Sequence, residues 1–400
     1  MNWKTMLLAA TLAVPLTAVA QISGDAVRIG VLEDMSGLYA DITGQGSVEA
    51  ARMAVADFGG TVLGKRIEIV FGDHQNKADV AGSVTRKWFD VDGVDMVTGL
   101  GNSATALAVY QLGRDKQRIV MVSGAASTAL TGVQCSPFGV HWTYDTYALA
   151  RGTGQAVVKA GGDSWFFLTA DYAFGHSLEK DVTDVVKANG GRILGSARHP
   201  LNASDFGAFL LQAQASKAKV IGLANAGGDT VNAIKAASEF GIVKGGQSLA
   251  GLLVFVNDIH ALGLTVTQGL SLTEAFYWDM DDQTRAWSRR YFGTMKKMPN
   301  MLQAGVYGAV THYLKSVKEA GTDDPTRVMQ TMRKLPVNDF FTKNGSVRED
   351  GRVMRDMYLF TVKKPQESER AWDYYRLVAK IPAEQAFRPL SESACPLVKK

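Results

Sequence analysis

The stretch DMVTGLGNSATALAVYQLGRDKQRIVMVSGAAS, residues 95–127, decides the fold of this chain. It begins with an apolar run that ends in a glycine-rich turn, continues through a helical pattern at 103–114, and closes with a second apolar run at 118–123. Continuous apolar strands joined by an amphipathic helix are typical of a parallel sheet that is covered on both faces. The sequence therefore predicts an α/β fold.

The same alternation of strands and helices occurs twice along the chain. In the first part we expect strands at 27–33, 66–72, 95–99 and 118–123, with helices at 47–58, 80–91 and 103–114. The pattern then restarts, with strands at 165–169, 192–196, 219–223 and 251–256 and helices at 178–189, 205–215 and 230–240. Two consecutive units of similar size predict two doubly wound, Rossmann-like lobes.

The C-terminal third follows a different pattern. A strand is expected at 269–276, followed by helices at 283–295, 303–320 and 325–335, a turn at Asn344 and Gly345, and a hairpin of 357–363 with 372–378. We expect the chain to cross back to the first lobe near residue 272 and to return near 345, which makes three hinge strands. The first lobe then comprises 25–143 and 272–344, and the second comprises 144–271 and 345–400.

The first twenty residues have the pattern of an export signal. Lys4 precedes an apolar stretch at 6–14, and the small residues Ala18 and Ala20 form a cleavage site before Gln21. An apolar run this short does not span a hydrocarbon layer of about 30 Å. We therefore expect residues 1–20 to be a cleaved signal peptide and the mature protein to be periplasmic; the alternative is an ordinary buried N-terminal helix.

Charge and cysteine content narrow the class of protein. The 43 basic and 39 acidic residues are well mixed, so the chain has no basic stripe of the kind that binds nucleic acid. Cys135 and Cys395 are the two cysteines, and an even number in an oxidising compartment predicts a disulfide. Two separate thiols are the alternative. The six histidines show no metal-ligand spacing, so we expect neither a metal nor a cofactor.

An enzyme needs a catalytic motif, and the common ones do not occur in this sequence. Asp73 and His74 follow a strand and could form an acid–base pair, but we expect them to lie in a solvent-facing loop instead. Gly99 and Gly101 fit a dinucleotide fingerprint, yet the next strand, at 118–123, ends without the carboxylate that this fingerprint requires. The same glycines lead into the N-terminus of the helix expected at 103–114, and a helix N-terminus also suits a carboxylate. We therefore expect a non-enzymatic anion site at this turn.

Five motifs in consistent order make the chain resemble the type I periplasmic binding proteins of ABC transporters, in the leucine/isoleucine/valine-binding class. They lie at 29–37 with 44–46, 99–105, 122–127, 170–175 and 224–230. The resemblance implies two lobes that close on a small organic anion like a Venus flytrap, and delivery to a membrane permease with its ATPase. A monomer is the simplest expectation for such a shuttling clamp.

The resemblance also suggests a set of ligand contacts. It places a carboxylate on Ser103, on Ser127 and on the backbone at Ala125, while the second lobe closes with Tyr172 and Phe174. The alternative is that the two serines only cap helices. The candidate ligand-binding residues are therefore Tyr39, Asn102, Ser103, Ala125, Ala126, Ser127, Tyr172, Phe174, Asn225, Gly227 and Phe255.

One departure from the family concerns the ligand class. Amino-acid binders of this family hold the ligand ammonium with an acid in the stretch that reads GLLVF here, at 251–255. Burying an ammonium without a paired anion is costly, and we expect the nearby Asp258 to cap a helix instead. Together with a resemblance to aromatic-acid members at 373–375 and 395–398, this favours an aromatic or keto acid. A branched-chain amino-acid binder and a ligand-sensing clamp for a receptor are the alternatives.

Overall fold

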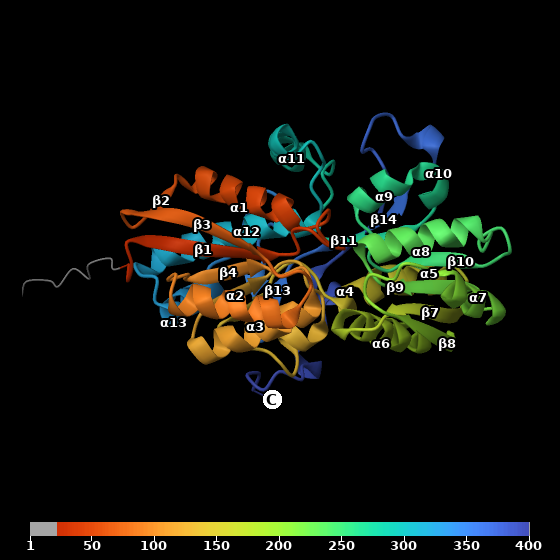
Figure 1. The fold of residues 1–400 in the computed structure, drawn as a ribbon, viewed down its shortest axis with the longest axis horizontal. Coiled ribbons are helices and arrows are strands. Elements are labelled where there is room, and N and C mark those ends of the chain that lie inside the picture. The colour runs from red at the N-terminus through yellow and green to blue at the C-terminus, as the bar shows by residue number, and fades with distance from the viewer. Residues whose placement is uncertain (1–21, 400) are drawn as a thin grey trace, which may run out of the picture.

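The computed structural model describes residues 22–399, and these form two α/β lobes that lie side by side (Figure 1). The expected fold class is therefore confirmed. The predicted signal peptide at 1–20 lies outside the described residues. Within 22–399, none of the helices combines the length and apolar character needed to cross a membrane.

The first lobe is built on a six-stranded sheet in the order β2-β3-β1-β4-β5-β6. All pairings are parallel except that of β2 with β3. Strands β4 and β5 are completely buried, as their continuous apolar sequences predicted. The elements are β1 Ala26–Glu33, α1 Gly44–Phe58, β2 Thr61–Val62, β3 Lys65–Asp73, α2 Ala78–Asp90, β4 Met96–Gly99, α3 Ser103–Lys116, β5 Ile119–Val122 and β6 Gly139–His141.

The second lobe contains a four-stranded parallel sheet in the order β10-β9-β7-β8. The prediction of a strand at 251–256 is wrong: β10 ends at Gly251, and Phe255 is the N-cap of α9. This apolar run is buried as a loop rather than as a strand. The elements are β7 Ser164–Ala170, α6 Ala173–Ala188, β8 Arg192–His199, α7 Gly207–Ala215, β9 Val220–Ala224, α8 Gly227–Glu239, β10 Ser248–Gly251, α9 Val256–Leu262 and α10 Leu264–Thr267.

The C-terminal third adds helices to the first lobe and a small sheet to the second (Figure 1). Helix α12 packs along α1, and the antiparallel sheet β11-β14-β15 contains the predicted hairpin, whose second strand begins at Tyr375 rather than at residue 372. The elements are β11 Ser271–Glu274, α11 Asp282–Met295, α12 Met301–Ala320, α13 Pro325–Lys334, β12 Ser346–Val347, β13 Val353–Met354, β14 Met357–Val362, β15 Tyr375–Ile381 and α14 Ala383–Ala386.

The entry into the second lobe is a helix with a π-helical turn in its middle: α4 Thr146–Leu149, the π turn Ala150–Gly154, and α5 Gln155–Lys159. Thr153 of this turn hydrogen-bonds Thr273 of β11, with 2.8 Å between the hydroxyl oxygens. Two crossings between the lobes therefore lie side by side.

The third crossing follows β13. The backbone of Arg352 forms an isolated parallel β-bridge with His141 at the end of β6. The Arg352 guanidinium donates to the Tyr144 carbonyl at 2.8 Å. These contacts keep residues 346–354 beside the first sheet. We infer that the chain returns to the second lobe after residue 354, later than the expected boundary at 345.

The predicted disulfide between Cys135 and Cys395 is present. It attaches the C-terminal tail to the first lobe. A few residues earlier, Arg388 donates to Asp181 on α6 of the second lobe at 3.0 Å. The tail therefore contacts both lobes.

Candidate ligand-binding cleft

Six of the candidate residues line a cavity between the lobes. Tyr39, Ser103 and Ala126 come from the first lobe, and the others are Tyr172, Phe174 and Phe255. Ser103 is the first residue of α3, just beyond β4, and Tyr172 is the N-cap of α6, just beyond β7. Because loops at the carboxyl ends of parallel strands meet at one edge of a sheet, both lobes present these loops to the cleft.

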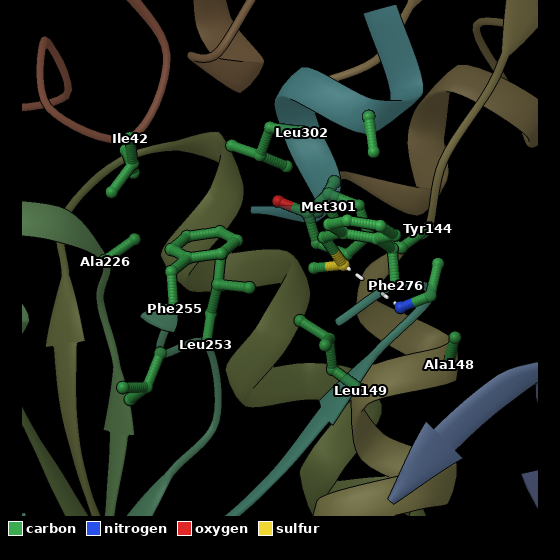
Figure 2. Packing of buried hydrophobic residues seen from close by; sticks show 14 of the residues in the cluster. Ile42, Tyr144, Ala148, Leu149, Ala226, Leu253, Phe255, Phe276, Met301 and Leu302 are labelled. Carbon is green, nitrogen blue, oxygen red and sulfur yellow. Dashed lines mark hydrogen bonds between the residues drawn. The ribbon is translucent and has the colours of Figure 1, made fainter. Parts of the chain in front are cut away.

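The rest of the wall is mostly apolar. In Figure 2, Ile42 and Leu302 of the first lobe lie across from Leu253 and Phe255 of the second. Sequence reasoning missed seven lining residues: Ile42, Gly101, Gly124, Tyr144, Ala226, Leu253 and Leu302. None of the thirteen described residues that line the cavity carries a charged side chain.

Tyrosine hydroxyls close this cavity. The hydroxyl oxygens of Tyr39 and Tyr172 lie 2.6 Å apart across the cleft, and that of Tyr144 donates to the Gly124 carbonyl at 2.8 Å. Burial raises the pKa of all three phenols above the usual value, so they remain neutral hydrogen-bonding groups. The cavity has a volume of only about 10 Å³, so it must widen to hold a ligand larger than water.

The loop before α3 offers fewer free donors than the sequence suggested. The Asn102 side chain accepts from the backbone N–H groups of Ala104 and Thr105, at 2.8 and 3.2 Å. The N–H of Gly101 donates to Glu33 at 2.8 Å. Asn102 is therefore a helix cap, and part of the predicted anion site is already occupied by groups of the protein itself.

Other hydrogen-bond donors remain available at the loops after β4 and β5. Within residues 22–399, the backbone N–H groups of Ser103, Ala125 and Ala126 make no hydrogen bond to the protein. The Ser103 hydroxyl oxygen accepts from the Ser127 N–H at 3.3 Å, which leaves the hydroxyl hydrogen free to donate. A ligand carboxylate placed here meets amide and hydroxyl donors rather than a cation.

Five candidates do not line the cavity: Asn102, Ala125, Ser127, Asn225 and Gly227. Asn225 is buried, bonded through its amide to His199 at 3.1 Å and to Thr230 at 2.7 Å. Gly227 has a φ of 55°, and a side chain there would come within 2.8 Å of the Tyr39 ring. Asn225 is therefore bonded within the second lobe, whereas Gly227 lets the backbone of that lobe approach Tyr39.

Ser127 lines a different feature. It caps the 3-10 turn Thr128–Thr131 and borders an open groove of about 550 Å³ under the C-terminal tail. The arginines and the lysine of this groove are paired with carboxylates: Arg388 with Asp181, Arg348 with Asp350 and Lys180 with Asp184. We therefore place the ligand in the smaller cavity, where donors remain unpaired.

Asp258 does not supply an acid to the cavity. Its side chain accepts from the Phe255 N–H at 2.9 Å and caps α9, as the sequence suggested. Burial raises its pKa to about 7. Leu253 lines the cavity in this segment instead, so the cavity wall is hydrocarbon there.

The comparison with known families matches this architecture. A family model described as periplasmic binding protein covers residues 26–368. The chain belongs to the periplasmic binding proteins. Its family and structural neighbours are type I ligand-binding components of ABC transporters, which bind solutes and are not enzymes. No match was found among curated proteins.

Several solved periplasmic binding proteins are similar. One from Burkholderia mallei is 59% identical, with a TM-score of 0.92 over 94% of this chain and all of that one. A protein from Burkholderia xenovorans described as a branched chain amino acid ABC transporter periplasmic ligand-binding protein is 41% identical, with a TM-score of 0.83 over 93% of this chain and all of that one. A Rhodopseudomonas palustris solute binding protein in complex with 3,4-dihydroxybenzoic acid shares the fold at 21% identity, with a TM-score of 0.81 over 90% of this chain and 98% of that one.

Proposed function

We propose that this periplasmic binding protein captures a small organic carboxylate, an aromatic or keto acid, and delivers it to an ABC permease and its ATPase. The observation that carries this proposal is the composition of the cavity: apolar and aromatic walls, hydroxyl groups, and unpaired backbone donors at one end, with no charged side chain among its described lining residues. We further propose that the signal peptide is removed on export and that the protein acts as a monomer.

The carboxylate end of the ligand belongs at the loops after β4 and β5. The N–H groups of Ser103 and Ala126 and the Ser103 hydroxyl belong to lining residues, and the Ala125 N–H lies next to them in the chain; none of these hydrogens has an acceptor within residues 22–399. Hydrogen bonds to an ionised acceptor are stronger than neutral ones, and rigid backbone donors lose little entropy when they form. An anion therefore gains most of its polar binding energy at this end.

The other end of the cavity favours an uncharged body. Leu253, Phe255 and Phe174 present carbon surfaces, and the ammonium group of an amino acid finds no carboxylate among the described lining residues. An unpaired buried ammonium costs several kcal/mol. Benzoate-like acids and aryl keto acids avoid this cost and fill an apolar space.

A thermal-shift screen tests the proposal. Benzoates, aryl keto acids and branched-chain amino acids are compared at equal concentration, because a bound ligand raises the melting temperature by mass action. We expect the acids without an ammonium to shift the melting temperature and the amino acids to leave it unchanged. A leucine shift with no response to any aromatic or keto acid contradicts the proposed ligand class.

A branched-chain amino acid is the second candidate ligand. The Burkholderia xenovorans branched chain amino acid ABC transporter periplasmic ligand-binding protein favours it, since that protein is 41% identical to this one. If this chain binds leucine, the ammonium group of the ligand must pair with an acidic residue that is not among the residues lining the cavity. The same screen separates the two candidates.

A further inference from the structure

A buried acid lies directly behind the loop that borders the ligand cavity. Glu33 ends β1 and is 0% exposed. One of its carboxyl oxygens accepts from the Gly101 N–H at 2.8 Å, and the other accepts from the Ser47 hydroxyl at 2.9 Å. Because Gly101 itself lines the cavity, only one peptide unit separates this carboxyl group from the ligand space.

The loop between β4 and α3 packs tightly against the Glu33 carboxyl group. A side chain on Gly99 would come within 2.7 Å of one Glu33 oxygen, and a side chain on Gly101 would come within 3.1 Å of the other. Gly99 also has a φ of 91°, which favours glycine. The two glycines that suggested an anion site in the sequence thus make room for an acid of the protein itself.

No cation balances Glu33 among the described residues. The charged and titratable groups facing it are Asp34 next in the chain, Asp73 and His74 at the end of β3, and the Tyr144 phenol before α4. Burial lowers the pKa of His74 to about 4, and that of the Tyr144 phenol is raised, so both are neutral. The surroundings of Glu33 are therefore neutral or negative.

We propose that Glu33 couples ligand capture to proton uptake: an anionic ligand is held beside Gly101 while the Glu33 carboxyl carries a proton. This inference rests on the proposed carboxylate ligand. An ionised Glu33 would place two negative charges about 7 Å apart, which weakens binding roughly fifty-fold at an effective dielectric constant of about 20. A protonated Glu33 removes this repulsion.

The pH range of the effect follows from the burial of Glu33. Burial raises its pKa to about 8, so the group is mostly protonated at neutral pH. Affinity for an anion is then constant below about pH 8 and falls above it, by at most about tenfold per pH unit, because each binding event takes up a proton from solution. The fall levels off where the ionised form binds the ligand directly.

Isothermal titration calorimetry with benzoate tests this coupling, since benzoate remains ionised throughout the range. Affinity is measured at about pH 6.5 and about pH 9.5, each in two buffers with different ionisation enthalpies, which counts the protons taken up. We expect the wild-type affinity to fall at least about tenfold, with uptake of roughly half a proton per binding event at the higher pH, because the pKa of Glu33 in the complex lies close to that pH. Glu33→Gln should bind at both pH values with no such fall and no linked proton.

Asp95→Asn is the matched control. Asp95 is also buried in the first sheet, but at the amino end of β4, and burial raises its pKa to about 6. This variant should keep the wild-type profile. Far-UV circular dichroism checks that both variants fold, and the two-buffer proton count of the wild-type protein stands independently of either variant.

Different failures of the experiment have different meanings. Benzoate binding that is independent of pH, or that falls equally in Glu33→Gln, overturns the coupling but leaves the proposed function in place. Leucine affinity that rises with pH and is lost in Glu33→Gln overturns both, because Glu33 would then be the partner of a ligand ammonium.

Discussion

The hydroxyl groups of Tyr39 and Tyr172 lie 2.6 Å apart and join the two lobes at the ligand cavity. Next to this contact, the Gly228 N–H donates to the Leu38 carbonyl at 3.3 Å. Gly227 lets the backbone approach the Tyr39 ring this closely. A hydrogen bond and a backbone contact thus hold the closed form beside the ligand space. The close backbone contact explains why position 227 is a glycine.

Removing either phenol hydroxyl should destabilise the closed form. One neutral hydrogen bond contributes about 1 kcal/mol, so Tyr39→Phe and Tyr172→Phe should each weaken ligand binding roughly fivefold, mainly through faster dissociation. The double variant should lose no more than either single variant, because the two hydroxyls share one bond. Stopped-flow dissociation rates measure the effect.

Tyr110→Phe serves as the control for the tyrosine pair. Tyr110 is buried in the first lobe, and its hydroxyl has no hydrogen-bond partner within residues 22–399. The substitution should leave the dissociation rate unchanged. If all three single variants alter the rate equally, the Tyr39–Tyr172 bond does not govern closure.

The two serines of the first lobe should behave differently. Ser103 lines the cavity and has a free hydroxyl hydrogen, so Ser103→Ala should weaken carboxylate binding by about tenfold or more. Ser127 caps the turn Thr128–Thr131, so Ser127→Ala should lower the free energy of unfolding by about 1 kcal/mol and change affinity by less than about twofold. Calorimetric titrations and urea unfolding separate these effects; the reverse ranking of affinities refutes this assignment of roles.

Opening the disulfide should destabilise the fold. Cys135 and Cys395 are separated by 260 residues, so their bond restricts a large loop in the unfolded chain. Replacing both with serine should lower the free energy of unfolding by roughly 4 kcal/mol, measured by urea denaturation under oxidising conditions. A loss below about 1 kcal/mol shows that the tail is held by its other contacts, such as Arg388 with Asp181.

The raised pKa of Glu33 should also make the folding stability depend on pH. The pKa of Glu33 is about 8 in the folded protein, and the ordinary value of 4.5 applies to the unfolded chain. The unfolded chain therefore releases this proton at a lower pH than the folded protein does. Folding stability therefore falls as the pH rises from about 4.5 to about 8 and levels off above that range. Glu33→Gln should gain stability relative to wild type across this window in urea unfolding. A constant difference between pH 5 and pH 9 contradicts the raised pKa.

Much of the fold could be predicted from the sequence because the strands of both lobes are short apolar runs bounded by turns. The stretch at 251–256 shows where this reasoning fails. An apolar run reports burial but not backbone conformation, and here the burial comes from a loop that packs at the lobe interface. The length of an apolar run therefore does not distinguish a strand from a buried loop.

The cavity was harder to predict than the fold. Residues beside strand ends, such as Ser103 and Tyr172, could be found because their position in a β–α unit fixes their place. Tyr144 and Leu302 reach the cavity from a hinge segment and from a helix in the last third of the chain, and local sequence patterns give no sign of this. Glu33 could have been noticed, since it is an acid at the end of an otherwise apolar strand.

The most direct test of the central claim compares phenylpyruvate with phenylalanine by isothermal titration calorimetry on the intact protein. The two ligands share a ring and a carboxylate and differ in a keto group against an ammonium. If the cavity accepts a carboxylate on an uncharged body, phenylpyruvate should bind at least about a hundredfold more tightly, since an unpaired buried ammonium costs several kcal/mol. Tighter binding of phenylalanine would contradict the claim.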